Sequence, residues 1–244
     1  MTARQGVTCA IMALNEEANL EAAVDEVRRE LGATGRPYEV LIVDDGSTDG
    51  TGAVADRLAA ALSHPGAEVR AIHHGENRGP GSAIVTGVAE AKMPLYCFHP
   101  ADNQVRFADI ARALDLLDDE YDLLVGQRSD RRDYSLPRLT ASYGYIGLAW
   151  LLFGLSGFRD FNFIYLWRTE LVKPMLPLET GGVFLCTEIL VRARDAGARI
   201  GVAPAEYRPR TAGVSTVGRP SVVAKTFAQM MGFWARRQRR RLLG

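Results

Sequence analysis

Cysteine is scarce in this chain, and neither a CxxC pair nor an apolar leader is present. The three cysteines, Cys9, Cys97 and Cys186, are widely spaced and odd in number. This pattern supports neither a disulfide framework nor a structural zinc site. Cys9 and Cys97 fall in apolar runs, so we expect them in the core of a protein from a reducing, cytoplasmic setting. Residues 1–6 lack the apolar stretch of a signal peptide.

Net charge is also absent, although the charges are unevenly spread. Basic and acidic residues number 29 each. The segment 219–244 holds seven of the cations and no acid, which leaves residues 1–218 with a net charge of −7. An acidic body argues against general nucleic-acid binding. The length suits one large domain over residues 1–218, followed by a basic amphipathic helix over residues 219–244.

One uncharged run is long enough to need a membrane test. Residues 139–158 contain no charged side chain, which is about the length that spans a bilayer. The run also contains four glycines, and candidate site residues lie both before and after it. A single crossing would put those residues on opposite sides of a membrane. We therefore expect a buried or interfacial helix.

Strand-like and helix-like segments alternate through the first half of the chain. Repeated β-α units with short loops imply an α/β fold with a mostly parallel sheet flanked by helices. The predicted strands span residues 7–14, 38–43, 69–73, 95–99 and 123–126. The predicted helices span residues 17–31, 51–62 and 108–117, with another beginning near Pro80.

The second half is less regular. We expect strands over residues 163–167 and 200–207, and helices over residues 185–196 and 221–241. Helical periodicity places the apolar residues of the last helix on one side. These are Val223, Phe227, Met230, Met231 and Trp234.

The acidic and glycine-rich clusters of the first half follow predicted strands. Ligands on parallel sheets bind beyond the carboxyl ends of the strands. Four segments meet this rule: residues 15–17, 44–49, 77–79 and 100–104. They are distant in sequence, and we expect them to meet at one edge of the sheet. The four histidines show no ligand spacing. His99 adjoins the segment 100–104, and we expect it to be structural, with a contact to that segment as the alternative.

The run from Asp44 to Asp49 is the most specific of these clusters. A strand ends there, the chain turns at Gly46, and Asp49 or Thr51 can cap the next helix. Capping does not explain two carboxylates, Asp44 and Asp45, at the end of a buried strand. Adjacent aspartates repel one another and need a partner, such as ligand hydroxyls, an amide edge or a metal.

At this point the chain resembles family 2 glycosyltransferases of the GT-A fold, over roughly residues 7–216. The ordered set of motifs is similar to the branch that contains dolichyl- and polyprenyl-phosphate mannose and glucose synthases. The motifs are residues 13–17 (ALNEE), 43–51 (VDDGSTDGT), 77–83 (NRGPGSA), 102–104 (DNQ), 126–128 (GQR), 160–165, 188–190 (EIL) and 210–215 (RTAGVS).

The resemblance implies a nucleoside-diphosphate sugar donor and a divalent cation, Mg or Mn. Glu16 or Glu17 and Asp44, with Asp45 supporting, are expected to hold the base and ribose. The full set of implied donor-binding residues is Leu14, Asn15, Glu16, Glu17, Asp44, Asp45, Asn77, Gly79, Ala101 and Asp102. Asp102 and Gln104 are expected to ligate the cation, which neutralises charge on the departing diphosphate.

Pro100 departs from the family pattern. The family's DxD motif places an aspartate two residues before Asp102, and proline stands there instead. A metal site with one fewer carboxylate is still possible, completed by water, a diphosphate oxygen or Asn103. We expect weaker metal affinity or a changed ribose contact. The alternative is a catalytically impaired homologue that still binds nucleotide sugars.

Two carboxylates are implied on the acceptor side. Asp160, together with Asp102, is the expected catalytic residue, and Asp160 is the candidate base in similar enzymes. A sugar hydroxyl needs its proton removed, whereas a lipid phosphate is already anionic and needs only positioning. Glu188 stands at a helix start, either facing the acceptor or as a cap-region acid.

A basic loop follows the last predicted strand. Arginine forks suit phosphate oxygens, so we expect this loop to bind the donor diphosphate or an acceptor phosphate. The alternative is a solvated turn. The expected phosphate or acceptor residues are Arg128, Arg208, Arg210, Ser215 and Glu188. Arg131 and Arg132 either add to this pocket or form a solvated surface run.

The tail joins aromatic residues to a cation cluster, Arg236–Arg241 included. Such a helix can lie on an anionic membrane face; a nucleic-acid tail and a solvated terminus are the alternatives.

The family resemblance as a whole implies an inverting hexosyltransferase that uses a GDP-mannose or UDP-glucose type donor. The implied acceptor is a polyprenyl or dolichyl phosphate at the cytoplasmic membrane face. A soluble acceptor is the close alternative.

Overall fold

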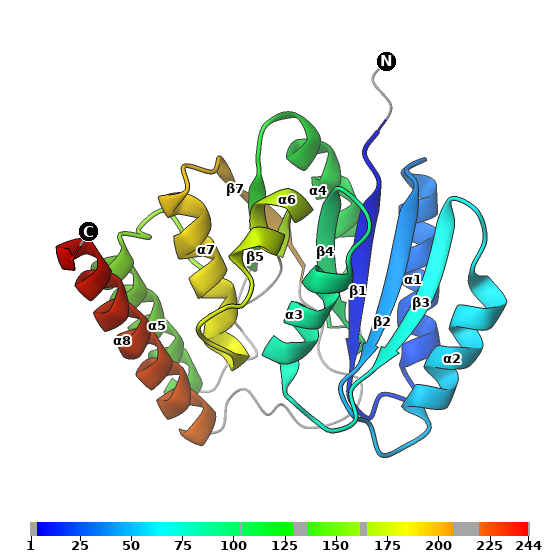
Figure 1. The fold of residues 1–244 in the computed structure, drawn as a ribbon, viewed down its shortest axis with the longest axis horizontal. Coiled ribbons are helices and arrows are strands. Elements are labelled where there is room, and N and C mark those ends of the chain that lie inside the picture. The colour runs from blue at the N-terminus through cyan, green and yellow to red at the C-terminus, as the bar shows by residue number, and fades with distance from the viewer. Residues whose placement is uncertain (1–3, 103, 129–135, 162–164, 207–219, 244) are drawn as a thin grey trace.

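A seven-stranded sheet forms the centre of the computed structural model, which describes residues 4–102, 104–128, 136–161, 165–206 and 220–243 (Figure 1). The strand order is β3-β2-β1-β4-β6-β5-β7. β6 runs antiparallel to β4 and β5, and the other pairings are parallel. The strands are β1 (Val7–Ala13), β2 (Tyr38–Asp44), β3 (Ala67–His73), β4 (Leu95–Pro100), β5 (Leu123–Arg128), β6 (Tyr165–Arg168) and β7 (Ile200–Ala205). The predicted α/β class with a mostly parallel sheet is confirmed.

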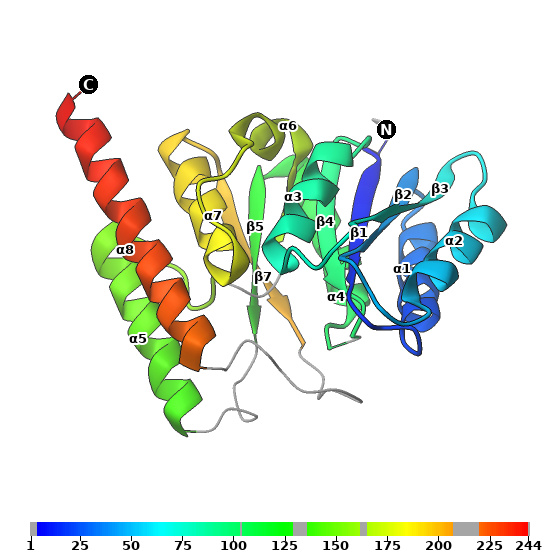
Figure 2. The same ribbon diagram turned by 60° about the horizontal axis from the view of Figure 1, so that its bottom comes forward.

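Helices cover both faces of this sheet. α1, α2 and α4 pack on one face with the inward side chains of β1 and β2. α3, α5, α7 and α8 enclose a second apolar cluster on the other face (Figures 1 and 2). The helices are α1 (Leu20–Ala33), α2 (Thr51–Leu62), α3 (Pro80–Glu90), α4 (Phe107–Asp119), α5 (Leu136–Phe153), α6 (Thr169–Val172), α7 (Leu185–Asp195) and α8 (Pro220–Leu243). Short 3-10 turns span Lys173–Met175 and Gly182–Phe184.

Strand burial explains why the first-half elements were predictable. β2 is buried along its whole length, as is β1 except at one position. Strands covered on both faces read as near-continuous apolar runs, and Cys9 and Cys97 are fully buried within them, as expected. The main differences between predicted and observed boundaries are at helix ends. α5 stops at Phe153, five residues before the uncharged run 139–158 ends, and the next residue, Gly154, takes a positive φ of 67°.

The apolar side of α8 differs in part from the prediction. Met230 is fully buried, but Met231 is 43% exposed, so the five apolar residues do not share one environment. Phe233 is buried instead, between the rings of Phe153 on α5 and Phe184. α8 packs against two neighbours at once, so its buried arc is rotated from the predicted one.

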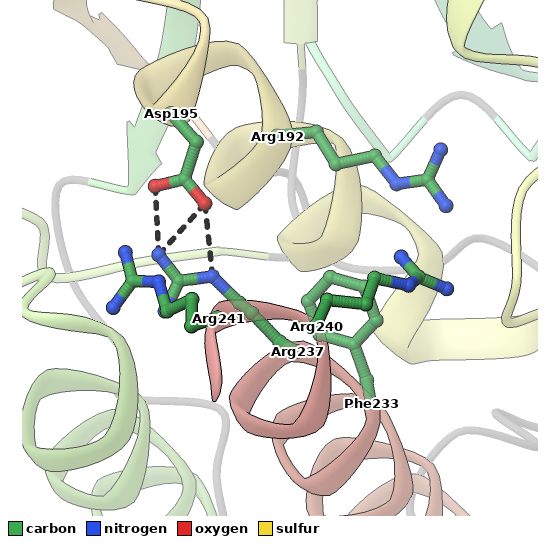
Figure 3. A pocket seen from close by; sticks show the side chains of 6 residues that line it. All are labelled: Arg192, Asp195, Phe233, Arg237, Arg240 and Arg241. Carbon is green, nitrogen blue, oxygen red and sulfur yellow. Dashed lines mark hydrogen bonds and ion pairs between the residues drawn. The ribbon is translucent and has the colours of Figure 1, made fainter. Parts of the chain in front are cut away.

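The arginines at the end of α8 hold the helix to the body of the protein. Arg236 and Arg240 pair with Glu179, at 2.8 and 2.7 Å, and Arg237 pairs with Asp195 at the end of α7. Figure 3 shows the Arg237 side chain reaching the Asp195 carboxylate beside a shallow pocket. Three of the five tail arginines are therefore engaged within the protein. Among the described residues, no helix combines the length and apolar character that crossing a bilayer requires.

Candidate active site

The carboxyl ends of the parallel strands meet at the lower edge of the sheet in Figure 1. The register pairs Ala13 with Asp44 and Met12 with Pro100, so β1, β2 and β4 end side by side. β6 starts at the same edge because it is antiparallel to β4 and β5. The structure thus brings together the strand-end segments that the sequence selected.

The loops after β1 and β2 are hydrogen-bonded to each other. Asn15 takes a positive φ of 55°, its N–H donates to Ser47 Oγ at 2.9 Å, and its side-chain oxygen accepts the Thr48 N–H at 2.8 Å. Glu17 accepts the N–H of Gly50 at 3.0 Å. A side chain at Gly50 would collide with that carboxylate, since a Cβ there would lie 2.5 Å from it. These contacts fix two predicted donor-binding segments as one unit.

Smaller contacts complete this unit. The Glu16 N–H donates to Thr51 Oγ1 at 2.9 Å, and the Glu16 carboxylate accepts from the Asn19 amide. Asp49 accepts the N–H of Thr51 at 3.0 Å, at the start of α2, as the sequence predicted. Leu14, at the end of β1, is 37% exposed beside this unit.

Asp44 is held by a histidine of the neighbouring strand. Its Oδ2 lies 3.0 Å from His73 Nδ1, and its Oδ1 accepts the Ser47 N–H at 3.0 Å. Burial raises the pKa of Asp44, but the bonds from Ser47 and His73 outweigh it and leave the pKa below its ordinary value. His73 Nε2 lies 3.1 Å from Asp56. The bond to Asp44 raises the pKa of His73, whereas partial burial acts to lower it. The contact with Asp56 adds to the rise, so the pKa lies above its ordinary value.

Asp45 has a histidine of its own. His74 Nδ1 lies 2.7 Å from Asp45 Oδ1, and His74 Nε2 lies 2.9 Å from Thr86 Oγ1 on α3. The same aspartate oxygen accepts the N–H of Arg78 at 3.1 Å. Asp45 therefore links the end of β2 to the loop after β3 and, through His74, to α3.

The loop after β3 packs tightly against the turn at Gly46. Gly46 has a φ of +74°, and a Cβ there would lie 2.3 Å from the backbone of Glu76, so only glycine fits. Asn77 accepts the N–H of Gly79 at 2.9 Å, and α3 begins at Pro80 directly afterwards. Backbone N–H groups at a helix start attract phosphate. The loop thus presents the start of α3 at the same edge as Asp44.

The loop after β4 carries the expected metal ligands. Ala101 is buried, and its N–H donates to Met12 O at 3.0 Å. Asp102 is half-buried and accepts the Gln104 N–H at 3.2 Å. Within the part of the chain that the structure describes, no group of three His, Cys, Asp or Glu residues could hold a metal ion. One carboxylate and one amide oxygen fit a cation only if ligand oxygens, such as those of a diphosphate, complete its shell.

Asp160 lies between α5 and β6, in a stretch that leads to the start of β6. Its Oδ1 accepts the N–H of Phe161, which packs against Tyr145 of α5. β6 begins five residues later, at the edge where β4 and β5 end. Arg128 is half-buried at the carboxyl end of β5, opposite Ala205 of β7. Both residues thus belong to segments that reach the candidate site.

Glu188 has a structural role in place of an acceptor-facing one. It is fully buried, and its two oxygens accept the N–H groups of Glu179 and Thr180, each at 2.8 Å. Arg192 pairs with it at 2.8 Å, one helical turn further on. This correction has a physical cause. The chain before α7 folds back over the start of that helix and encloses the carboxylate.

Several predicted residues lie outside the described part of the chain. They are Asn103, Arg131, Arg132, Arg208, Arg210 and Ser215. The sequence reasoning missed His73 and His74, which hold the two site aspartates. The contact depends on the parallel register of β2 and β3, which places His73 opposite Asp44 and which the sequence alone does not specify.

The chain is similar to known glycosyltransferases. The model of the family described as glycosyl transferase family 2 matches residues 8–165. An undecaprenyl-phosphate 4-deoxy-4-formamido-L-arabinose transferase of Edwardsiella ictaluri is 30% identical over 215 residues, which is 88% of this chain and 63% of that protein. An uncharacterized glycosyltransferase of Mycobacterium bovis is 30% identical over 95% of this chain and 98% of its own length. The chain spans only 38 to 63% of the formamido-arabinose transferases that it matches.

Solved structures share the fold. Glucosyl-3-phosphoglycerate synthase from Mycobacterium tuberculosis, crystallised with Mn2+, UDP-glucose and phosphoglyceric acid, has a TM-score of 0.71 at 16% identity, over 95% of this chain and 80% of that one. A mannosyltransferase from Pyrobaculum calidifontis, in complex with GDP-Man and Mn2+, has a TM-score of 0.63 at 21% identity, over 94% and 65%. Identities this low establish similarity of fold alone.

Proposed function

We propose that this chain, which belongs to glycosyl transferase family 2 and has the GT-A fold, moves a sugar from a nucleoside-diphosphate donor to a polyprenyl phosphate. The observation that carries the donor half of the proposal is the pair Asp44 and Asp45. Each is buried at a strand end and fixed by its own histidine. Fixed carboxylates at this edge suit the hydroxyl and N–H groups of a nucleoside.

The donor would lie across the edge of the sheet. Asp44, with Glu16 or Glu17, is assigned to base and ribose, and Asp45 holds the loop that contributes Asn77 and Gly79. The N–H groups at the start of α3 are suited to the diphosphate. Leu14, Asn15 and Ala101 form the backbone of this pocket. A GDP-mannose or UDP-glucose type donor remains our proposal, and a pentose donor joins the candidates because of the relatives' names.

Asp102 and Gln104 would hold a divalent cation together with the donor diphosphate. Bound there, Mg or Mn would offset the negative charge of the leaving group. Pro100 removes one carboxylate from the usual set, so the protein's own share of the site is small. We assign the chain a working site with low intrinsic metal affinity.

For the acceptor, an already ionised phosphate needs no general base. One of its oxygens bonds to the anomeric carbon while the bond from that carbon to the donor diphosphate breaks, and the electron pair leaves with the nucleoside diphosphate. Attack opposite the leaving group inverts the anomeric configuration. Asp160 would then orient the acceptor, and Arg128 with the loop containing Arg208, Arg210 and Ser215 would hold its phosphate. With a hydroxyl acceptor, Asp160 would instead remove a proton.

The names of several relatives support a lipid phosphate as the acceptor, since these are undecaprenyl-phosphate 4-deoxy-4-formamido-L-arabinose transferases. Such acceptors sit in membranes, so we place the protein at the cytoplasmic membrane face as a peripheral protein. Residues 1–218 would form the catalytic domain. The helix α8 would be an appendage docked on it.

The test is turnover with a panel of nucleoside-diphosphate sugars, a short-chain prenyl phosphate and Mn2+, followed through release of nucleoside diphosphate. We expect release that needs both substrates and is lost in Asp102→Asn. Asp25→Asn, a matched change at an exposed site on α1, should retain activity. Binding of nucleotide without turnover of any donor would instead favour the impaired homologue.

A further inference from the structure

The outer face of α5 exposes large apolar side chains. Leu136 and Leu151 are each 80% exposed, Tyr143 is 57% exposed and Trp150 is 38% exposed. Measured from Leu136, positions 143, 150 and 151 fall within an arc of about 100° around the helix axis, so all four lie on one face of the helix. The exposed positions between them are Pro137, Thr140, Gly144 and Gly147, which carry no charge. Apart from Leu136 and Pro137, which precede Arg138, this face belongs to the uncharged run of the sequence.

A second apolar stripe runs along α8. Met231 is 43% exposed and Leu242 is 85% exposed. Ala224, Ala228 and Ala235 are also exposed and fall at helical spacing on the same face. Nine large hydrophobic residues are exposed in the described part of the chain, and six of them lie on α5 and α8. The exposure is therefore concentrated on these two helices.

The two stripes lie on neighbouring helices. Tyr145 of α5 meets Phe227 of α8 with ring centroids 6.1 Å apart, and Phe153 meets Phe233 at 5.9 Å. Figures 1 and 2 both show α5 and α8 side by side at one end of the molecule, outside α7. Their opposite faces are occupied by this packing, which leaves the outer faces of both helices in solvent. We call these outer faces together the α5–α8 face.

The charges around the α5–α8 face have one sign. Neither helix contains Asp or Glu. Lys225, Arg239 and Arg241 on α8 are exposed cations, whereas Arg236, Arg237 and Arg240 pair with carboxylates of the body. A second copy seated on this face would bring cations against cations. An anionic surface that also accepts apolar side chains is complementary to it.

We propose that the α5–α8 face docks on an anionic phospholipid bilayer, with Leu136, Leu151 and Met231 in the apolar layer just below the headgroups. Tyr143 and Trp150 are amphipathic rings of the kind that settle at such an interface. Exposed cations would contact lipid phosphates. The contact is thus made by the sides of two helices, and the tail arginines mostly serve to hold α8 in place.

The position of the α5–α8 face suits the proposed function. The role that we give to membrane docking rests on that function. α5 and α8 both follow strands that end at the candidate site, and Figure 1 shows the first turn of α8 toward that edge. A bilayer on the α5–α8 face would then lie beside the site rather than behind it. A prenyl phosphate could keep its chain in the bilayer while its phosphate reaches the strand ends.

The test is flotation of the whole chain with phosphatidylcholine vesicles, with and without phosphatidylglycerol, and with no prenyl lipid or donor. We expect binding that needs the anionic lipid. Leu136→Glu combined with Leu151→Glu should weaken vesicle binding by at least about tenfold. Two apolar anchors are lost, and the glutamates that replace them carry the same negative charge as the lipid headgroups. Leu116→Glu with Val202→Glu changes the charge equally at exposed positions on α4 and β7, and it should bind as the unsubstituted chain does.

A second readout reports the face directly. Trp150 is exposed, Trp167 is fully buried and Trp234 on α8 is half-buried. In a Trp234→Phe background, brominated lipids should therefore quench the fluorescence of Trp150, and adding Trp150→Phe should remove most of the quenching. Circular dichroism melting checks that all variants fold. Equal binding of the unsubstituted chain and the Leu136/Leu151 variant would overturn the proposal. So would a change from dimer to monomer in that variant, seen by light scattering, because it would identify a second copy as the occupant.

These outcomes separate docking from chemistry. Turnover of a soluble short-chain acceptor without vesicle binding would remove the docking proposal and leave the proposed function. Vesicle binding without turnover of any donor would do the reverse.

Discussion

The Nδ1 atom of His73, at the end of β3, lies 3.0 Å from Oδ2 of Asp44, at the end of β2. His73 in turn lies 3.1 Å from Asp56 on α2, so one imidazole joins two carboxylates. The carboxylate assigned to the nucleoside is thus fixed in direction before any ligand binds. A fixed carboxylate loses less freedom when it binds a ligand, which favours tight binding.

His73→Ala should weaken nucleotide binding roughly tenfold, because Asp44 loses a charge-assisted partner and the freedom of its side chain rises. Titration calorimetry with UDP and GDP would measure this. His64→Ala, at an exposed histidine in the loop before β3, is the matched control and should bind normally. The contacts with Asp44 and Asp56 raise the pKa of His73, so its stabilising effect is complete below the ordinary histidine value and is lost as pH rises through the raised pKa. The nucleotide affinities of the unsubstituted chain and His73→Ala should therefore differ less at alkaline pH. A difference in affinity that does not shrink as pH rises would argue against this role of His73.

Pro100→Asp should strengthen metal-dependent nucleotide binding by about tenfold, since it restores a carboxylate ligand beside Asp102. Asp102→Asn should abolish the effect of Mn2+ on nucleotide affinity while leaving metal-free binding in place. Calorimetry with and without Mn2+ distinguishes the two. If Mn2+ has no effect on the unsubstituted chain or on Pro100→Asp, the metal assignment of this loop is wrong.

Glu188→Gln should lower stability by about 2–4 kcal/mol, because it breaks a buried pair with Arg192 and weakens two bonds to backbone N–H groups. Denaturant unfolding would measure the loss. Nucleotide affinity should be unchanged, since this carboxylate faces the 179–180 turn. If Glu188→Gln keeps full stability but no longer uses the acceptor, Glu188 has the acceptor role expected from the sequence.

Asp122 should contribute to acid stability. Hydrogen bonds from Arg199, with a further one from Arg168, lower the pKa of Asp122 to about 2, although partial burial acts to raise it. A lowered pKa means that the contribution is present above the ordinary aspartate value and is lost as pH falls through about 2. Because solvent screens this partly exposed pair, Asp122→Asn should cost about 1 kcal/mol at neutral pH and much less near pH 2, measured by urea unfolding at several pH values. A difference that stays constant with pH would show that packing alone is responsible.

The sequence predicted the edge at which the strand-end segments meet, for a physical reason. Asp44 ends β2 and Asp102 follows the end of β4, and both strands are buried on both faces and therefore read as apolar runs. Parallel pairing then brings their ends to one edge without further information. The family resemblance added the assignment of the parts, and the GT-A fold it implied is confirmed.

What the sequence did not predict depends on packing between distant segments. The His73–Asp44 contact follows from the register of two strands, which no local pattern specifies. Glu188 is enclosed by a turn that returns over its own helix. Met231 is exposed and Phe233 buried because α8 has two neighbours, so a single amphipathic face was too simple a description.

The central claim is transfer of a sugar onto a lipid phosphate, and mass spectrometry of the lipid product tests it most directly. The chain would be incubated with Mn2+, a nucleoside-diphosphate sugar released in the donor panel, and a short-chain prenyl phosphate. The account predicts one new prenyl-phosphate sugar per nucleoside diphosphate formed, and none from Asp102→Asn. Release of nucleoside diphosphate with free sugar as the only product, whatever the prenyl phosphate supplied, would contradict it.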